Sequence, residues 1–361
     1  MVQKFSLKRY SIDDLKPGMI VGRSIYDERQ KELIAEGTVL TNQLIFSILD
    51  RSIFSVLIRE KVETSTLIDQ YLLDESFVSQ YEAILQELRR IFQDARKFGQ
   101  IDVECVKKLV HDYVIKLIVG LKSINHVHNL VREDDYLLHH SINVAILSGV
   151  FGQWLKLDPN EVEDLVIAGL MHDVGKTQIP LEILDKPGNL SEKEMLLVKQ
   201  HSAKGFELMR YGKLKENKRI LFGILQHHER VDGSGYPAGV TGENINAFAK
   251  IIAIADVYDA MAANKVYAKK HSPFDIFNAL SDDIINKLDT KYGVLFINNI
   301  CHSLNGNWVE LNNGKKAKII YIDESRINSL PVVQCENGDF IDLNKMKQLK
   351  IVKLLANNEI V

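Results

Sequence analysis

The chain has 361 residues, of which 46% are hydrophobic, and its formal net charge is −3. Such a length allows roughly two or three domains with a large core. The near-neutral charge argues against a surface for duplex nucleic acid, although a local positive pocket for a small anion stays open. Three distant cysteines without a CxxC pair favour a reducing, cytoplasmic setting over a disulfide framework. We find no signal peptide and no apolar run of about 18 residues, so we expect no membrane span.

Residues 1–62 are predicted to form a β-rich module. Pro17 and Gly18 mark a turn, and strands are expected in the segments MIVGRSIYD, ELIAEGTVLT and SIFSVLI. A short helix is expected in NQLIFSILDR. Residues 63–124 are predicted to be a helical hairpin or linker, because apolar residues recur at helical spacing over residues 65–98. That stretch is a candidate homodimer contact, and packing against the next domain is an equally good alternative.

Residues 125–303 are predicted to form the helical part of the chain. The segments DPNE, starting at Asp158, and SEKE, starting at Ser191, have the pattern of capping boxes that start helices. Residues 304–361 return to a period of two, with hairpin turns at Asn313-Gly314 and Asn337-Gly338. The expected fold class is therefore mainly α, a helical bundle flanked by a β-rich N-terminal module and a small SH3-like C-terminal module.

Six histidines and two aspartates stand in segments of unusual composition, which are HHSINVA, LMHDVGK, VKQHSAKG, LQHHERVDGSGYP and AIADVYDA. Neutral imidazole is the commonest metal ligand, and a carboxylate within an apolar helix needs a partner. An isolated His-Asp pair is more often a hydrogen-bonded pair in a core. Two adjacent histidines after an apolar run are harder to explain by packing. The ligand-type residues are His139 or His140, His172, Asp173, His201, His227, His228 and Asp256.

Five separate helical segments that each supply such a residue predict a multi-helix metal site. Mixed nitrogen and oxygen ligands suit Fe, Mn, Zn or Ni, and the ligand set does not choose among them. A carboxylate with several histidines on either side suggests two metals about 3.5–4 Å apart, an arrangement that suits phosphoryl transfer.

At this point the motifs resemble a known family. The order HD, GK, KxHxxxG, HHERxDGxGYPxG and the Asp in IADVYDA is similar to that of the HD-GYP domain over about residues 125–300. The resemblance implies an HD-type helical bundle that hydrolyses the phosphodiester of cyclic di-GMP. It also selects His140 over His139, because the family motif has His-Ser there. One metal would then be held by His140, His172, Asp173 and Asp256, and Asp173 would bridge to a second held by His201, His227 and His228.

The resemblance also implies substrate contacts. Lys176 would lie near the substrate phosphate, and Gly235 and Tyr236 of the GYP stretch would shape the guanine pocket. Asp134 is grouped with these substrate-binding residues. Some members carry a Glu four residues before the first His that helps to hold a third metal; Tyr136 stands there, so a dinuclear site is expected.

One segment departs from the family pattern. After the last metal Asp the family usually reads SDRPYRK, and this chain reads ANKVYAKK, with Lys265 in place of Arg and Ala268 in place of a second basic residue. Lysine is a point charge that cannot bind phosphate or guanine in a bidentate way, although Lys265 and Lys269 can still supply charge. The sequence therefore predicts the metal ligands more firmly than the substrate.

The implied mechanism uses two divalent ions, with Fe or Mn favoured over Zn or Ni. A metal-bridging hydroxide would attack phosphorus in line, with Asp173 as bridging ligand and Lys176 stabilising charge, to give linear pGpG and, after a second turn, GMP. Three alternatives stay open: a phosphodiesterase for another cyclic dinucleotide such as 3′,3′-cGAMP, a non-catalytic cyclic-dinucleotide receptor, and a general HD nucleotide phosphohydrolase. The GYP loop argues against the last.

Overall fold

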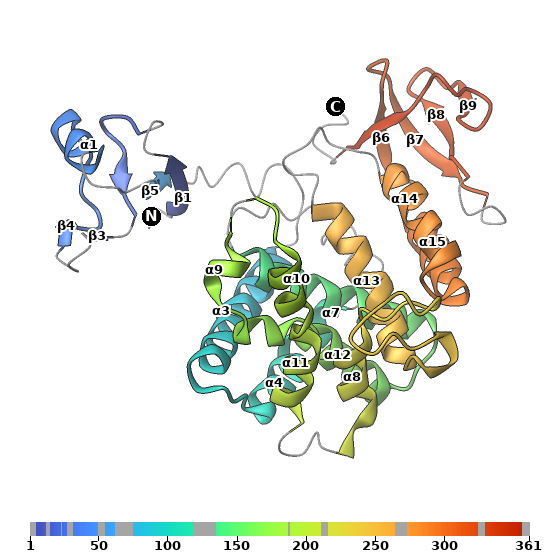
Figure 1. Cartoon of the computed structure of the whole chain (residues 1–361). Coiled ribbons are helices and arrows are strands. Elements are labelled where there is room, and N and C mark those ends of the chain that lie inside the picture. Colours follow the sequence, from blue (N-terminus) through green and yellow to red (C-terminus); the bar gives the residue numbers. More distant parts are fainter. Residues whose placement is uncertain are drawn as a thin grey trace. The chain divides into compact units, whose positions relative to one another are not determined.

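The computed structural model describes eleven stretches of the chain, and all structural statements below concern these residues. They are 5–11, 15–22, 24–26, 32–49, 55–61, 75–118, 135–186, 188–210, 216–263, 273–323 and 329–355. Contacts divide the chain into two compact units, each described by itself (Figure 1). The first comprises residues 1–72 with 133–135, and the second residues 73–132 with 136–361.

In its described residues, the first unit consists of short strands and the helix α1 (Asn42–Leu49). Strand β5 (Ser55–Lys61) pairs antiparallel with β1 (Phe5–Ser11) on one side and β2 (Ile20–Val21) on the other. Strands β3 (Ile25–Tyr26) and β4 (Glu32–Ile34) form a second, two-stranded sheet, and α1 (Asn42–Leu49) follows. The β-rich character and the short helix agree with the sequence, whereas β1 has no strong strand pattern and was not singled out.

The second unit is mainly helical and contains the candidate site residues. Its helices are α3 (Glu75–Phe98), α4 (Val103–Leu109), α5 (Ile115–Leu117), α7 (Tyr136–Trp154), α8 (Pro159–Met171), α9 (Leu181–Leu184), α10 (Glu192–Lys199), α11 (His201–Met209), α12 (Lys218–Gln226), α13 (Ala247–Ala263), α14 (Pro273–Asn286) and α15 (Thr290–Leu304). A π-helical turn, Val110–Val114, joins α4 to α5. The mainly helical fold class is thus confirmed.

Helix α7 is the centre of the bundle. It is apolar on all sides, and every residue from His140 to Gly152 is buried, as expected for a helix that neighbours surround completely. Helices α3, α8 and α13 pack against it. The capping boxes at Asp158 and Ser191 are both present, and they start α8 and α10 where the sequence places them.

Helix α3 packs inward within the second unit. Its residues Tyr81, Ile84 and Leu88 are at most 2% exposed and belong to the same core cluster as α7 and α8. Gly99 adopts a positive φ of 64° after the helix, and Asp102 caps α4 through Glu104 and Cys105. This packing corresponds to the second reading of the hairpin, and a homodimer through residues 65–98 stays a prediction.

The C-terminal strands form one antiparallel sheet in the order β10-β6-β7-β8-β9. They are β6 (Trp308–Leu311), β7 (Lys316–Tyr321), β8 (Val332–Cys335), β9 (Phe340–Asp342) and β10 (Ile351–Leu354). Gly314 and Gly338 have φ values of 80° and 89° and turn the two hairpins that their Asn-Gly pairs predict. Among the described helices, none has the length and apolarity needed to cross a membrane.

Candidate metal centre

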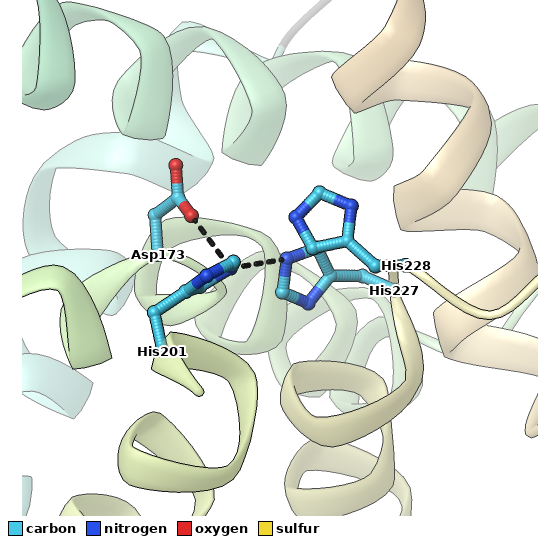
Figure 2. A group of neighbouring side chains, drawn as sticks. All are labelled: Asp173, His201, His227 and His228. Atoms are coloured by element: carbon cyan, nitrogen blue, oxygen red, sulfur yellow. Dashed lines mark hydrogen bonds and ion pairs between the residues drawn. The ribbon is translucent and has the colours of Figure 1, made fainter. Parts of the chain in front are cut away.

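Five helical segments bring the candidate ligands together. His140 lies on α7, His172 directly follows α8, and His201 begins α11. His227 and His228 follow α12, and Asp256 lies on α13. Because α8 and α12 both end at their histidines, these side chains extend from helix termini into one buried space. Figure 2 shows four of the converging side chains.

Asp173 is shared by two groups of potential ligand atoms. One group joins Asp173 with His201, His227 and His228, and the other joins it with His140 and His172, and within each group the ligand atoms lie within 4.8 Å of one another. The Oδ1 atom of Asp173 lies 3.3 Å from Nε2 of His201, and its Oδ2 atom lies 3.4 Å from Nε2 of His172. One carboxylate therefore stands between two clusters, as a ligand bridging two cations would.

Backbone carbonyls fix three of the imidazole rings in the same orientation. The Nδ1 atoms of His172, His201 and His227 each lie 2.7 Å from the carbonyl oxygen three residues earlier. A carbonyl only accepts hydrogen bonds, so each Nδ1 carries the proton and each Nε2 keeps its lone pair. All three Nε2 lone pairs are thus available to the buried space, the arrangement seen in metal-binding histidines.

The charge states suit cation ligands. Burial lowers the pKa of His201, lowers that of His227 well below its usual range and lowers that of His228 to about 3, so these imidazoles are neutral at pH 7. Burial alone would raise the pKa of Asp173, but Lys176, His172 and His201 together outweigh burial and lower that pKa well below its usual range, so the carboxyl is ionised. Neutral imidazoles around a buried carboxylate are the ligand forms that divalent transition metals bind.

Two buried polar atoms test whether a cation fits. The Nε2 atom of His172 and the Oδ1 atom of Asp173 have no hydrogen-bond partner, although both are buried. Leaving such atoms unpaired costs roughly 1–3 kcal/mol each. The Nε2 atoms of His201 and His227 are only 3.3 Å apart, with both Nδ1 protons committed to carbonyls. Facing lone pairs repel each other, and a cation between them removes that repulsion, so the residues fit a metal.

His140 is held between two carboxylates. Its Nδ1 atom lies 2.7 Å from Oδ2 of Asp259, and its Nε2 atom lies 3.0 Å from Oδ1 of Asp256. Burial disfavours the imidazolium, but the hydrogen bonds to Asp256 and Asp259 outweigh burial and raise the pKa of His140 to about 10. His139 instead faces α3, where its ring stacks on that of Tyr81 at 5.7 Å. The structure therefore places His140, and not its neighbour, in the cluster.

Lys176 sits at the edge of the cluster. Its Nζ atom lies 2.6 Å from Oδ2 of Asp173, and a quarter of its side chain (25%) is exposed, whereas that of Asp173 is buried. Burial alone would lower the pKa of Lys176, but the charge and hydrogen bond of Asp173, together with the charge of Asp256, outweigh burial and raise the pKa, so the ammonium stays charged. A cation with one exposed side next to the cluster can bind an incoming anion such as phosphate.

The loop after His228 is fixed by a buried carboxylate that the sequence did not reveal. Glu229 is 2% exposed, and its oxygens accept hydrogen bonds from the backbone nitrogens of Ala238 (2.8 Å) and Val240 (3.1 Å). This brings Tyr236 over the ring of His228, with the centroids 4.6 Å apart. The only available signal was an acidic residue directly after two ligand histidines.

Two glycines allow close backbone contacts around the cluster. A Cβ atom on Gly175 would lie 1.8 Å from the carbonyl oxygen of His201, and one on Gly235 would lie 2.4 Å from the backbone nitrogen of Arg230. No side chain fits in either place. Gly175 thus brings the turn that carries Asp173 against the first turn of α11, which sets the distance between Asp173 and His201.

The remaining polar residues near the ligand segments differ in what the structure describes of them. Asp134, Lys265 and Lys269 lie outside the described residues. Arg230 and Lys204 bind backbone carbonyls, those of His227 and Glu229 for the arginine and that of Gln178 for the lysine. Both side chains therefore hold the local backbone in place. Asp259, one turn after Asp256 on α13, is buried and holds His140.

Comparison with known proteins finds an HD domain and related phosphodiesterases. The family model described as "HD domain" matches residues 124–291. The cyclic di-GMP phosphodiesterase PdeB of Borreliella burgdorferi is 33% identical over 63% of this chain and 62% of its own length. The 3′3′-cGAMP-specific phosphodiesterase 1 of Vibrio cholerae is 33% identical over 46% of this chain and 38% of its own length. The structure of Bd1817, a HDG"Y"P protein from Bdellovibrio bacteriovorus, covers 81% of this chain and 98% of that protein at 16% identity with a TM-score of 0.49.

A helical bundle with histidines and aspartates gathered around one carboxylate, matched by the HD model, defines the second unit as an HD-domain protein. Through this HD domain and its GYP loop, the chain is similar to HD-GYP proteins. It spans less than two thirds of the length of these two curated relatives.

Proposed function

We propose that this chain is a metal-dependent phosphodiesterase that hydrolyses cyclic di-GMP to linear pGpG and, by a second cleavage, to GMP. The main supporting observation is that Asp173 stands between two groups of potential ligand atoms, which together comprise six side chains, five buried and one, His228, half-buried. The relative PdeB, a cyclic di-GMP phosphodiesterase, supports the choice of substrate. A soluble second messenger suits a cytoplasmic enzyme, and three widely spaced cysteines without a CxxC pair, Cys105, Cys301 and Cys335, suit a reducing compartment.

Two divalent ions fit the site, with Fe or Mn our first choice and Zn or Ni the alternatives. His140, His172, Asp173 and Asp256 would hold one, and Asp173, His201, His227 and His228 the other. Such a pair supplies an activated water near neutral pH and neutralises charge on the phosphate oxygens. Tyr136 has no carboxylate and so offers no ligand of that kind to a third metal, and its ring stacks on that of His140 with the centroids 5.6 Å apart.

The remaining chemistry belongs to the protein. The partly exposed ammonium of Lys176 binds a non-bridging phosphate oxygen and stabilises the charge that grows there during in-line displacement. Asp173 holds that ammonium in place. The ring of Tyr236, fixed over His228 by the loop that Glu229 organises, offers an aromatic surface for a guanine.

The second candidate is a phosphodiesterase for 3′,3′-cGAMP. It is supported by the relative from Vibrio cholerae and by Lys265 in place of the arginine that the family usually has. A non-catalytic receptor is less well supported, because all seven candidate ligands are present.

One experiment tests these readings together. The protein is purified without added metal, its metals are quantified, and it is then loaded with Mn²⁺ or Fe²⁺ under anaerobic conditions. Turnover of cyclic di-GMP and of 3′,3′-cGAMP is followed in parallel by product mass. We expect pGpG from the first substrate. Faster turnover of 3′,3′-cGAMP would favour the second candidate, and tight binding without turnover would favour a receptor.

A further inference from the structure

A buried chain of hydrogen bonds leads from α3 to the candidate ligand His140. Tyr81, on α3, donates from its hydroxyl to Oδ1 of Asn143 at 3.1 Å. The Nδ2 atom of Asn143 donates to Oδ1 of Asp259 at 2.9 Å, and the other carboxylate oxygen accepts from Nδ1 of His140 at 2.7 Å. All four residues are at most 3% exposed. Tyr81 lies before the segment 124–291 that the HD model matches.

The direction of each hydrogen bond in this chain is determined. The carboxylate of Asp259 only accepts, so His140 carries its proton on Nδ1 and Asn143 presents its amino group. The carbonyl oxygen of Asn143 then faces Tyr81, whose hydroxyl must donate. That hydroxyl has one proton, so the Nδ1 atom of His139, 3.1 Å away, donates to the phenol oxygen. No link can be reversed without placing two acceptors or two donors together.

The chain acts on the ligand through Asp259. An imidazole that donates its Nδ1 proton to a carboxylate keeps its ring orientation and binds metal more strongly through Nε2. Asn143 fixes which way that carboxylate faces, and Tyr81 fixes the amide of Asn143. The phenol ring is itself held by stacking on His139 at 5.7 Å with an interplanar angle of 16°.

We propose that Tyr81 is a positioning residue for His140, so that a hydroxyl outside the HD segment sets the affinity of the metal centre. The inference rests on the proposed metal-dependent function. It also gives the two adjacent histidines separate roles, His140 as ligand and His139 as the residue that orients Tyr81. Through α3, the segment that precedes the HD domain acquires a direct route to the site.

The test is Tyr81→Phe, which removes the hydroxyl and keeps the ring. Mn²⁺ affinity of the metal-free protein is measured by competition with a chelator, with circular dichroism as a check of folding. We expect affinity to fall about threefold, less than the 10–100-fold range for a group bonded directly to a ligand, because Asn143 and Asp259 stand between Tyr81 and His140. The control is Tyr113→Phe, an exposed tyrosine of the π-helical turn (42% exposed), which should bind Mn²⁺ as the parent does. Unchanged affinity in Tyr81→Phe would overturn the proposal.

A double-mutant cycle separates positioning from general loosening of the fold. If Tyr81 acts through Asp259, then Tyr81→Phe should cause no further loss of Mn²⁺ affinity in an Asp259→Asn background. Fully additive losses would refute the inference. Should Tyr81→Phe fail to fold, Asn143→Ser breaks the chain at the next link and carries the same expectation. The readout needs no turnover, so a protein that binds Mn²⁺ through this chain but hydrolyses no cyclic dinucleotide refutes the proposed function alone.

Discussion

The ammonium of Lys176 lies 2.6 Å from the Oδ2 atom of Asp173, one turn along the same 3₁₀ segment. Lys176 is close enough to the cluster to reach a bound phosphate, yet it supplies no lone pair to a cation. A variant that lacks Lys176 should therefore lose transition-state stabilisation and still bind metal.

We expect Lys176→Ala to lower kcat for cyclic di-GMP about 100-fold, the usual effect of losing one charge-stabilising donor in the transition state. Bound metal should stay at the parental level. Steady-state kinetics and elemental analysis of the same preparation measure both. Lys186→Ala, which removes a surface lysine paired with Glu194, is the matched control and should keep parental kinetics. Loss of metal in Lys176→Ala would show that the lysine supports the cluster instead.

Asp173→Ala should remove both metals at once, because this carboxylate belongs to both groups of ligand atoms. We expect metal content near zero and no measurable turnover. The Asp173→Ala variant should still fold, because replacing this short side chain by alanine leaves only a small cavity. Asp94→Ala, which removes an exposed carboxylate on α3, is the control and should keep its metals. Turnover that persists in Asp173→Ala would contradict the dinuclear scheme.

Metal affinity should rise with pH. In the metal-free protein the pKa of His140 is raised to about 10, so at neutral pH its imidazole is protonated and a cation must displace that proton. Below pH 10 each unit of increase should strengthen binding at that position up to tenfold. The histidines of the other group have lowered pKa values and add little. Calorimetry in buffers of different ionisation enthalpy counts the protons released, and the absence of any release would contradict the assignment.

Glu229→Ala should release the loop that carries Tyr236. The backbone nitrogens of Ala238, which is exposed, and Val240, which is half-buried, would exchange their acceptor for water, which costs about 0.5–1.5 kcal/mol for each lost hydrogen bond. We expect a higher KM for cyclic di-GMP with little change in metal content. Glu229→Gln keeps one acceptor oxygen, so its KM should lie between those of the parent protein and Glu229→Ala. An unchanged KM would mean that the loop does not contact the substrate.

Much of the second unit follows from local sequence chemistry. The capping boxes at Asp158 and Ser191 and the Asn-Gly turns act within a few residues, so the chain reveals them directly. The sequence also predicts that the ligand segments converge, because histidines next to apolar helical runs are hard to explain by packing alone. These signals need no knowledge of which helices are neighbours.

The residues that support the ligands could not be predicted from the sequence. Tyr81 and Asn143 are separated by 62 positions, and Tyr81 reads there as an ordinary apolar position of an amphipathic helix. Glu229 stands in a charged loop and gives no sign that it is buried. Their partners are set by how α3 packs on α7 and by how the loop folds back, and both depend on tertiary contacts.

The missing side chain of Gly175 has a practical consequence. Because the His201 carbonyl occupies the place of its Cβ atom, Gly175→Ala would push α11 away while leaving every ligand in the sequence. A survey that counts histidines and aspartates would class such a variant as a working enzyme. We therefore expect a natural homologue with alanine at this position to be inactive, even though it keeps every ligand residue.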